Sequence, residues 1–245
     1  PALTTAKEPK ARPERGETDG LAHEDTISGD APVIRVEIVK AQQMTGGVTK
    51  YEFAALDGAP LPEWQAGAHL DIVVAPEFLR QYSLSGDPAD RSRYQIAVLR
   101  EDGGRGGSKL LHRIFTQGRK IFISKPINHF PLASGATRTF LMGGGIGVTP
   151  MIAMAHELHE KGADFELHYS CSRKADAGFL EDLAAFEWRD RVQLYFSDQG
   201  TRADLDDVLG GYRKGSHVYA CGPDRYMTSV MEAADRAGFT ADERH

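Results

Sequence analysis

The pattern of apolar residues changes once along this chain of 245 residues, near Pro131, and this change constrains the fold most strongly. Before it, short alternating segments such as VIRVEIV, HLDIVV and RYQIAVLR are bounded by Gly, Pro or Asp turns, which is typical of antiparallel barrels or sandwiches. After it, strand-like and helix-like segments alternate from TRTFLMGG to DRYMTSVMEAADRAG, which predicts a doubly wound parallel sheet. The sequence therefore predicts two domains, an all-β antiparallel barrel at 32–131 and an α/β domain at 132–245.

The first 31 residues differ from the rest because they contain almost no apolar side chains. They hold four basic residues, seven acidic residues and several prolines. Such a segment buries too little apolar surface to offset the entropy that is lost on ordering. We therefore expect residues 1–31 to form a disordered tail, with a role in docking as the alternative.

Composition argues against several classes of function. The formal net charge is −6, and no Lys/Arg cluster is interleaved with aromatic residues, so a nucleic-acid surface is not expected. No run approaches the roughly 18 to 20 apolar residues that cross a bilayer, and no signal-peptide region is seen. Cys171 and Cys221 are too few for a disulfide framework or a four-ligand metal site. We expect a cytoplasmic protein that holds no metal and has a small-molecule or protein partner.

A first glycine-rich stretch, GRGGSKLLHRIF at 104–115, follows an expected strand and opens a short expected helix. Ser108 is the expected N-cap of this helix. Glycine amides at a helix start donate hydrogen bonds to phosphate, and Arg105 adds positive charge. An ordinary glycine-rich turn is the alternative reading.

A second stretch, LMGGGIGVTPMIAM, places glycines between an apolar strand and a helix. Without Cβ atoms the backbone can approach the phosphates of a nucleotide. The spacing departs from the G-x-G-x-x-G dinucleotide fingerprint, because the third glycine would fall at Val148. We expect a different type of nucleotide loop, with a tight strand–helix turn as the alternative.

Two further segments carry side chains suited to a cofactor. VYACGPDRYM ends a strand with Cys221 at the carboxyl edge of the expected sheet, where ligands gather, although such a cysteine is more often a small buried hydrophobe. In RQYSLSGDP, Arg80 can pair with a phosphate, Tyr82 can pack beside a planar ring, and Ser83 can hydrogen-bond a ring nitrogen.

Five motifs in this order resemble the ferredoxin–NADP reductase superfamily: RQYS at 80–83, AVLR at 97–100, GRGGS at 104–108, GGGIGVTP at 143–150 and CGP at 221–223. GRGGS and SKPINHFPL are similar to the branch that contains phthalate dioxygenase reductase and vanillate demethylase reductase, whose flavin is FMN. The resemblance runs from about Val33 to the last residue.

The resemblance implies an electron-transferring flavoprotein that takes a hydride from NADH and passes electrons through FMN to an iron–sulfur centre feeding a Rieske-type oxygenase. FAD and NADPH are the alternative cofactors. A flavin-free nicotinamide dehydrogenase and a non-catalytic flavin- or nucleotide-binding regulator are alternatives of other classes.

The same resemblance implies roles for individual residues. Ser83 and Cys221 would lie at the reacting rings, and Asn128 and Phe130 would help to join the two domains. The expected flavin contacts are Arg80, Gln81, Tyr82, Ser83, Ala97, Val98, Arg100, Arg105, Gly106, Gly107 and Ser108. The expected nucleotide contacts are Gly144, Gly145, Gly147, Val148, Thr149, Ser172, Arg173, Cys221, Gly222 and Pro223.

The chain departs from the pattern of this branch in two places. Members usually continue beyond the equivalent of Glu243-Arg244-His245 into a plant-type [2Fe–2S] domain, so we expect the iron–sulfur carrier to be either a separate ferredoxin or a further domain of a longer chain. Ile127 stands where an arginine is expected, which puts one flavin or interdomain contact in doubt. Ser172 and Arg173 could also read a 2′-phosphate, so NADPH stays open beside NADH.

Overall fold

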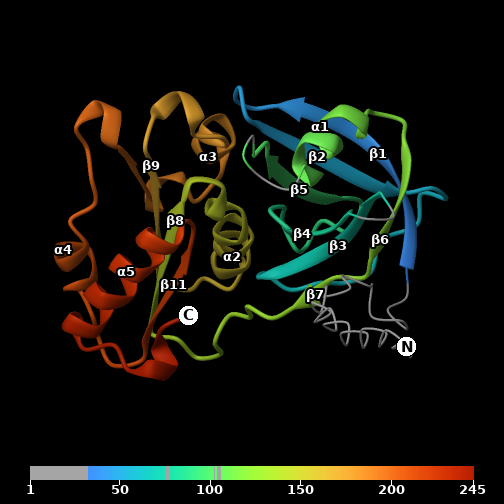
Figure 1. Cartoon of the computed structure of the whole chain (residues 1–245). Helices are drawn as coiled ribbons and strands as arrows, with labels where there is room; N and C mark the ends of the chain where they lie inside the picture. Colours follow the sequence, from blue (N-terminus) through green and yellow to red (C-terminus); the bar gives the residue numbers. More distant parts are fainter. Residues whose placement is uncertain (1–32, 76–77, 102, 104–105) are drawn as a thin grey trace, which may run out of the picture.

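The computed structural model describes residues 33–75, 78–101, 103 and 106–245. The tail expected at 1–31 and the candidate phosphate ligand Arg105 lie outside these described residues. The chain forms two sheets with different strand directions, one on each side of helix α2 (Figure 1). The predicted fold class, an antiparallel barrel followed by a parallel α/β sheet, is confirmed.

The first sheet is an antiparallel, nearly closed barrel with the strand order β4-β3-β6-β1-β2-β5. An antiparallel bridge between Leu84 and Ile96 joins its two outer strands just beyond β4. Helix α1, Gly107–Ile114, covers one end of the barrel with the buried Leu111. The strands are β1 Val33–Gln43, β2 Val48–Ala55, β3 Ala68–Ala75, β4 Phe78–Ser83, β5 Tyr94–Leu99, β6 Lys120–Ser124 and β7 Ile127–Asn128, which pairs with β3.

The second sheet is parallel throughout, with the strand order β10-β9-β8-β11. Helix α2 covers the face toward the barrel, and α4 and α5 cover the other face (Figure 1). The strands are β8 Arg138–Gly144, β9 Phe165–Cys171, β10 Val192–Phe196 and β11 Ser216–Cys221. The helices are α2 Val148–Glu160, α3 Leu180–Ala185, α4 Leu205–Leu209 and α5 Asp224–Ala237, with 3₁₀ turns η1 Gly145–Gly147, η2 Lys174–Asp176, η3 Arg189–Arg191, η4 Ser197–Gln199 and η5 Ala241–Glu243.

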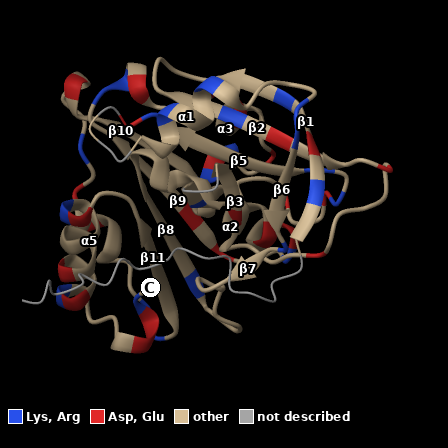
Figure 2. Ribbon diagram, turned by 45° about the vertical axis from the view of Figure 1, so that its right-hand side comes forward, with Lys and Arg blue, Asp and Glu red and all other residues tan. Residues whose placement is uncertain are grey.

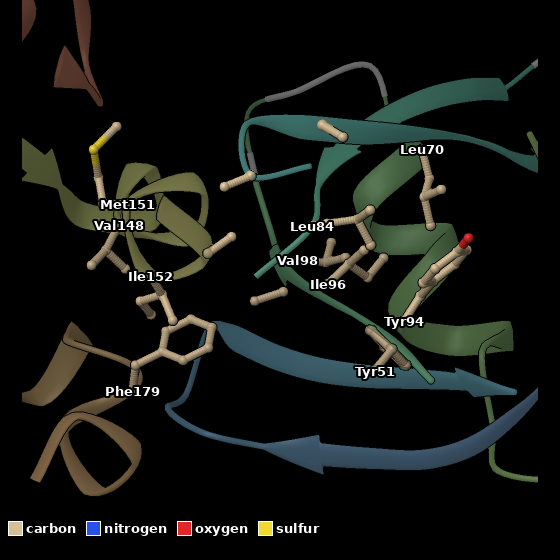
Figure 3. Close-up of a cluster of buried hydrophobic side chains, with 14 of the residues drawn as sticks. Tyr51, Leu70, Leu84, Tyr94, Ile96, Val98, Val148, Met151, Ile152 and Phe179 are labelled. Carbon is tan, nitrogen blue, oxygen red and sulfur yellow. The ribbon is translucent and has the colours of Figure 1, made fainter. Parts of the chain in front are cut away.

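One apolar core runs from the inside of the barrel to the parallel sheet through α2. Nine of the 13 residues of α2 are buried, because the helix has a sheet on one side and the barrel on the other. Figure 3 shows Val148, Met151 and Ile152 of this helix near Phe179. The two sheets therefore share a core, and a second core lies under α4 and α5.

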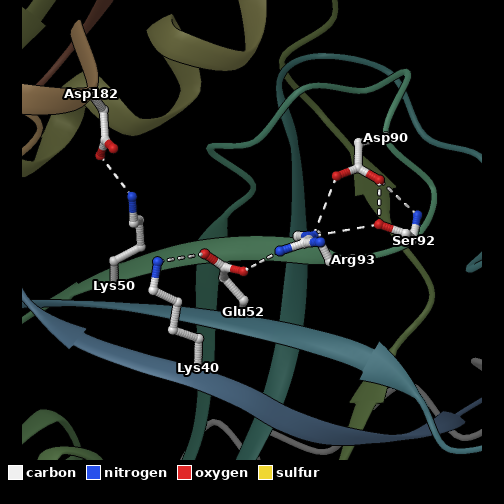
Figure 4. A network of polar contacts seen from close by, with 7 residues as sticks. All are labelled: Lys40, Lys50, Glu52, Asp90, Ser92, Arg93 and Asp182. Carbon is white, nitrogen blue, oxygen red and sulfur yellow. Dashed lines mark hydrogen bonds and ion pairs between the residues drawn. The ribbon is translucent and has the colours of Figure 1, made fainter. Parts of the chain in front are cut away.

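Polar and aromatic contacts also join the barrel to the parallel sheet and its helices. The Glu157 carboxylate on α2 accepts the backbone N–H of Ala66 at 2.8 Å. Lys50 on β2 is 6% exposed and donates to the Asp182 carboxylate on α3 at 2.7 Å (Figure 4). Phe130, which follows β7, packs edge-on against Tyr219 of β11 with ring centroids 5.5 Å apart. These contacts fix how the two sheets sit against each other.

The outer face of the barrel carries a small ion-pair network around Glu52. Figure 4 shows its carboxylate between Arg93, at 2.7 Å, and Lys40, at 3.6 Å. Glu52 is 5% exposed, so two cations compensate for the burial of its charge.

Charge is mixed along the surface elements, as Figure 2 shows for basic and acidic residues along α5. Among the helices of the described residues, none is long and apolar enough to span a bilayer.

His156 on α2 makes the stability of this packing depend on pH. Its Nδ1 accepts a hydrogen bond from the indole N–H of Trp188 at 3.3 Å, so the ring must be unprotonated at this atom. Burial lowers the pKa of His156, the charge of Asp87 opposes this shift, and His159 adds to it. The unfolded chain therefore binds more protons than the folded chain below about pH 6.5, the ordinary histidine value.

We expect the free energy of unfolding to fall as pH decreases through this range, and to fall less steeply in His156→Gln. Urea unfolding at a series of pH values measures both slopes. Equal slopes in the two proteins would contradict the assignment, because other histidines with lowered pKa values are present in both.

Candidate functional site

A pocket of about 410 Å³ opens where β4, β5 and the start of α1 meet the loop after β8. It lies at the side of the barrel that faces the parallel sheet, because Ile146 of η1 forms part of its wall. The described residues that line it are Arg80, Gln81, Tyr82, Ala97, Leu99, Glu101, Gly106, Gly107, Ser108 and Ile146.

Arg80 lies directly over the first turn of α1. A Cβ atom at Gly107 would stand 2.6 Å from its Nε, so a larger residue there would displace the guanidinium from this position. Arg80 also donates to the Leu79 carbonyl at 2.6 Å and stacks over the Phe78 ring at 5.1 Å. The guanidinium thus lies beside the N–H groups of a helix start, a combination of donors that suits phosphate.

Tyr82 stays neutral in this pocket. Burial raises its pKa to about 12, against the opposing charge of Arg80, while Tyr51 and Glu101 add to the rise. Its hydroxyl is therefore a donor as well as an acceptor at neutral pH.

The alternation of β5 decides which of its residues face the pocket. Ala97 and Leu99 line it, whereas the Val98 side chain is fully buried in the barrel core (Figure 3). Arg100 is exposed and does not line the pocket either. Leu99 and Glu101 were not expected from the sequence, although strand periodicity alone separates Leu99 from Val98.

Other expected flavin contacts take different places. Gln81 lines the pocket and donates to the Asp71 carboxylate at 2.9 Å, while Ser83 pairs across the sheet with His69 and does not line it. The expectation that Ser108 is the N-cap is wrong. The helix begins at Gly107 after Gly106 in the left-handed conformation, and the Ser108 hydroxyl accepts the N–H of Glu101 at 3.1 Å.

A second pocket, of about 560 Å³, lies at the carboxyl ends of the parallel strands. This is where ligands of open α/β sheets bind. Its wall contains many hydroxyl groups and two arginines: it comprises Gly144, Gly145, Ser170, Cys171, Ser172, Tyr195, Ser197, Thr201, Arg202, Ala203, Leu205, Pro223, Arg225, Tyr226 and Ser229.

The glycines after β8 let two loops touch. A Cβ atom at Gly147 would stand 2.3 Å from the Cys221 carbonyl oxygen, and one at Gly222 would stand 2.9 Å from Gly144 Cα. Gly144 itself lies under the Tyr226 ring. Gly145 has a φ of 55° and open space around its Cβ position, so a glycine is favoured here by the left-handed backbone of the turn and not by lack of space. The close approach of the C-G-P loop therefore explains why a glycine stands at position 147.

Two residues after this loop hold it in place. Val148 is fully buried and packs on Gly143. The Thr149 hydroxyl donates to the Ile146 carbonyl at 3.0 Å and is part of a buried side chain. Both residues support the loop, and neither lines the pocket.

Tyr226 brings a buried hydroxyl to this pocket. The oxygen has no hydrogen-bond partner by geometry among the described residues, although Ser170 lies close enough to lower its pKa. Burial is the dominant cause and raises the pKa of Tyr226 to about 12. A buried neutral hydroxyl at the wall of a pocket is a ready hydrogen-bond partner for a ligand.

Only some of the nucleotide contacts expected at the other strand ends line this pocket. Ser172 and Pro223 line the pocket. Arg173 is exposed and bound bidentately by Asp176 at 2.6 and 2.9 Å, and it does not line the pocket. Cys221 lies beside Gly147, and burial raises the pKa of its thiol, against the N–H of Gly222, so the thiol stays protonated at neutral pH.

The loop Gly144–Ile146 forms a wall of both pockets: its first two residues line the second pocket, and its third lines the first. Two ligands, one bound in each pocket, would therefore lie on opposite sides of this three-residue segment. The donors at Arg80 and Gly107 suit the phosphate of a flavin, and the hydroxyl-rich second pocket suits a nucleotide. The residues present thus fit both groups.

Comparison with known proteins agrees with this arrangement. Residues 120–243 match the family described as Dimethylamine monooxygenase subunit DmmA-like, N-terminal domain. The tert-butanol monooxygenase / tert-amyl alcohol desaturase reductase subunit of Aquincola tertiaricarbonis is 43% identical over 217 residues, which cover 87% of this chain and 63% of that protein. The vanillate O-demethylase oxidoreductase of a Pseudomonas species is 38% identical over 216 residues, which cover 87% of this chain and 68% of that protein.

A solved structure has the same fold. It is that of phthalate dioxygenase reductase, described as a modular structure for electron transfer from pyridine nucleotides to [2Fe–2S], with a TM-score of 0.82 and 33% identity. The match covers 87% of this chain and 67% of that one. The chain thus spans about two thirds of the length of the relatives it matches. The chain belongs to the branch of the ferredoxin–NADP reductase superfamily that contains phthalate dioxygenase reductase and vanillate O-demethylase oxidoreductase.

Proposed function

We propose that this chain is the flavin- and nicotinamide-binding part of an oxygenase reductase. It takes a hydride from NADH and passes electrons through FMN to an iron–sulfur protein or domain that feeds an oxygenase. The observation that carries the proposal is the pair of pockets that share the loop Gly144–Ile146. Its relatives, named as reductase subunits or oxidoreductases of oxygenase systems, support the same reading.

In this proposal the barrel, within 32–131, binds the flavin. Arg80 and the first turn of α1 hold the phosphate, and Tyr82 with Ala97 and Leu99 borders the ring system. One phosphate beside one arginine and one helix start is what FMN requires, and the GRGGS motif points to FMN as well. FAD remains the alternative flavin.

The α/β part, within 132–245, binds the dinucleotide. Its hydroxyl-rich pocket holds the adenosine side, and the loop Gly144–Ile146 directs the nicotinamide toward the first pocket. A bound flavin supplies the chemistry that the side chains lack, since it accepts electrons in pairs and releases them singly. The chain supplies proximity and orientation across the loop. Cys221, protonated and next to Gly147, stands at the same edge and would border the nicotinamide.

The partner in this proposal is a [2Fe–2S] ferredoxin or a [2Fe–2S] domain, with a Rieske-type oxygenase downstream. The description of the phthalate dioxygenase reductase structure gives electron transfer from pyridine nucleotides to [2Fe–2S] for that protein. We also propose a cytoplasmic location, as the sequence predicts.

Purification and reduction test the proposal. We expect a yellow protein whose released flavin has the mass of FMN, and whose absorbance bleaches on anaerobic addition of NADH. Ferricyanide or a [2Fe–2S] ferredoxin should then reoxidise it within seconds. A protein that stays colourless with FMN and FAD contradicts the proposal. A yellow protein that NADH and NADPH leave oxidised would instead be a flavin-binding regulator.

A further inference from the structure

Helix α1 is too short to be stable through its own turns. It spans eight residues, Gly107–Ile114, and begins after Gly106 in the left-handed conformation without a side-chain cap. Isolated helices of this length are marginal in water, so contacts with the barrel must fix its position. In the proposed function its first turn carries the N–H groups that meet the flavin phosphate. The side chains that anchor α1 therefore decide where those donors lie.

His112, in the last turn of α1, contacts two neighbouring strands. Its Nε2 lies 3.1 Å from the carbonyl oxygen of Val98 on β5, and its Nδ1 lies 3.3 Å from the hydroxyl oxygen of Thr49 on β2. Thr49 and Val98 are directly paired in the β2–β5 ladder. One imidazole thus binds both strands at the same level of the sheet, one through each ring nitrogen.

These partners select one form of the ring. A carbonyl oxygen only accepts, so Nε2 carries the proton and donates to Val98. In the neutral ring Nδ1 is then an acceptor, to which the Thr49 hydroxyl donates. Burial lowers the pKa of His112, the Val98 carbonyl opposes this shift, and the charge of Arg100 adds to it. His112 is therefore a neutral imidazole at neutral pH, and both of its nitrogens are bound.

The segments that His112 joins are walls of the flavin pocket. Ala97 and Leu99, on either side of Val98, line the pocket from β5. Ser108 lines it from α1, and it lies on the same helix face as His112, four residues earlier. The imidazole thus ties the helix wall of the pocket to its strand wall.

Apolar packing alone does not set the position of α1. Leu111 is fully buried and anchors the helix on the barrel core. The hydrophobic effect is non-directional, however, so such a contact tolerates small rotations and shifts of the helix. Hydrogen bonds from one side chain to two strands depend on distance and angle, and they restrict both movements.

We propose that His112 is a positioning residue for the flavin, which as a neutral imidazole holds α1 against β2 and β5 and so sets the place of the phosphate donors. The inference rests on the proposed function, because it concerns the same flavin pocket. His112 itself does not line that pocket, so it would act through α1. A helix start contributes up to about fivefold in the affinity for an anion. The guanidinium of Arg80 lies against Gly107, so a shift of α1 disturbs this donor as well.

Two variants of the 245-residue protein test this role. His112→Leu has no polar side-chain atom, whereas His112→Gln offers an N–H donor and an oxygen acceptor. Fluorescence titration should give a dissociation constant for FMN about five- to tenfold higher in His112→Leu, and within about twofold of the unchanged protein in His112→Gln. Riboflavin, which lacks the phosphate, should bind all three proteins equally well. His159→Gln, at an exposed position of α2, is the matched control and should bind FMN as the unchanged protein does.

Hydrogen exchange shows whether α1 itself has been released. The amides of Leu110 and Phe115, which donate to the carbonyls of Gly106 and Leu111, should exchange faster in His112→Leu, while the amides of β8 keep their protection. Thr49→Val, which leaves the histidine in place and removes one hydrogen bond, should raise the same exchange rates to a smaller extent. Unchanged exchange of α1 in both His112→Leu and Thr49→Val overturns the inference, and if His112→Leu does not fold, Thr49→Val decides alone.

The binding results separate the inference from the function beneath it. The role of His112 is wrong if His112→Leu keeps its FMN affinity, if it loses riboflavin and FMN by the same factor, or if His112→Gln is as weak as His112→Leu. In each of these cases the unchanged protein still binds FMN, so the proposed function stands. If the unchanged protein binds neither FMN nor FAD, the pocket is not a flavin site, and both fail.

Discussion

Arg80→Ala is expected to lose flavin, with a dissociation constant for FMN about ten- to hundredfold higher than that of the unchanged protein. The guanidinium lies against Gly107 at the start of α1, where it would pair with the phosphate. Without it, the helix start alone holds an anion, and such a contribution is typically below about 1 kcal/mol. Fluorescence titration of the apoprotein with FMN measures the change.

A matched control and a second ligand keep this result specific. Arg35→Ala removes another barrel arginine, which packs over the Phe122 ring and lines no part of the flavin pocket. It should bind FMN as the unchanged protein does. Riboflavin, which lacks the phosphate, should bind Arg80→Ala and the unchanged protein equally well. A variant that weakens riboflavin and FMN by the same factor would show that Arg80 shapes the pocket and does not meet the phosphate.

Among glycine-to-alanine substitutions in the α/β part, Gly147→Ala is expected to reduce stability most. Its Cβ would stand 2.3 Å from the Cys221 carbonyl oxygen and 2.6 Å from the Gly222 nitrogen, and both are backbone atoms of a packed loop. Neither can turn away as a flexible side chain can. We expect a loss of about 3 kcal/mol in unfolding free energy, and a higher KM for the nicotinamide nucleotide as the two loops separate.

A comparison with Gly145, two residues earlier, separates the steric cost of an added methyl group from its conformational cost. Gly147 has a φ of −64°, which alanine adopts freely, so the whole effect there is overlap. Gly145 has a φ of 55° and nothing within 4 Å of its Cβ position, so Gly145→Ala meets only the left-handed backbone penalty of about 1 to 2 kcal/mol. Urea unfolding of both variants should rank Gly147→Ala as the less stable. The reverse order of stability would mean that the C-G-P loop moves away from the added methyl group, so that Gly147 is not held in close contact with it.

The fold was predictable because both halves carry a periodic signal. The barrel strands alternate, and the second half repeats strand and helix, which predicts an antiparallel barrel followed by a parallel sheet. The strand order β10-β9-β8-β11 is known only from the structure. Helix α2 was also found, although burial on both sides removes the polar face that usually marks a helix. The length of the segment and the glycine loop before it predicted the helix instead. The start of α1 was misjudged, because Gly106 in the left-handed conformation takes the N-cap position from Ser108.

The site was predictable only where a motif lies inside one segment. Arg80, Tyr82 and Ala97 line the first pocket, as the motifs suggest, but AVLR contains both faces of a strand, and only the fold shows that Leu99 faces the pocket and Val98 the core. Tyr226 and Arg202 had no signal at all. They come from separate elements, and the pocket wall that both of them line forms only once the chain is folded.

The continuous core around α2 has a consequence for how ligands enter. A hinge that swung the barrel away from the parallel sheet would bring the apolar flank of this helix into water, at about 25 cal/mol for each Å² uncovered. Domain opening is therefore the costly route, and we expect ligands to enter through local movements of the loops and side chains around the loop Gly144–Ile146. If a flavin and a nicotinamide nucleotide bind in the two pockets as proposed, the same packing would hold the distance between them constant.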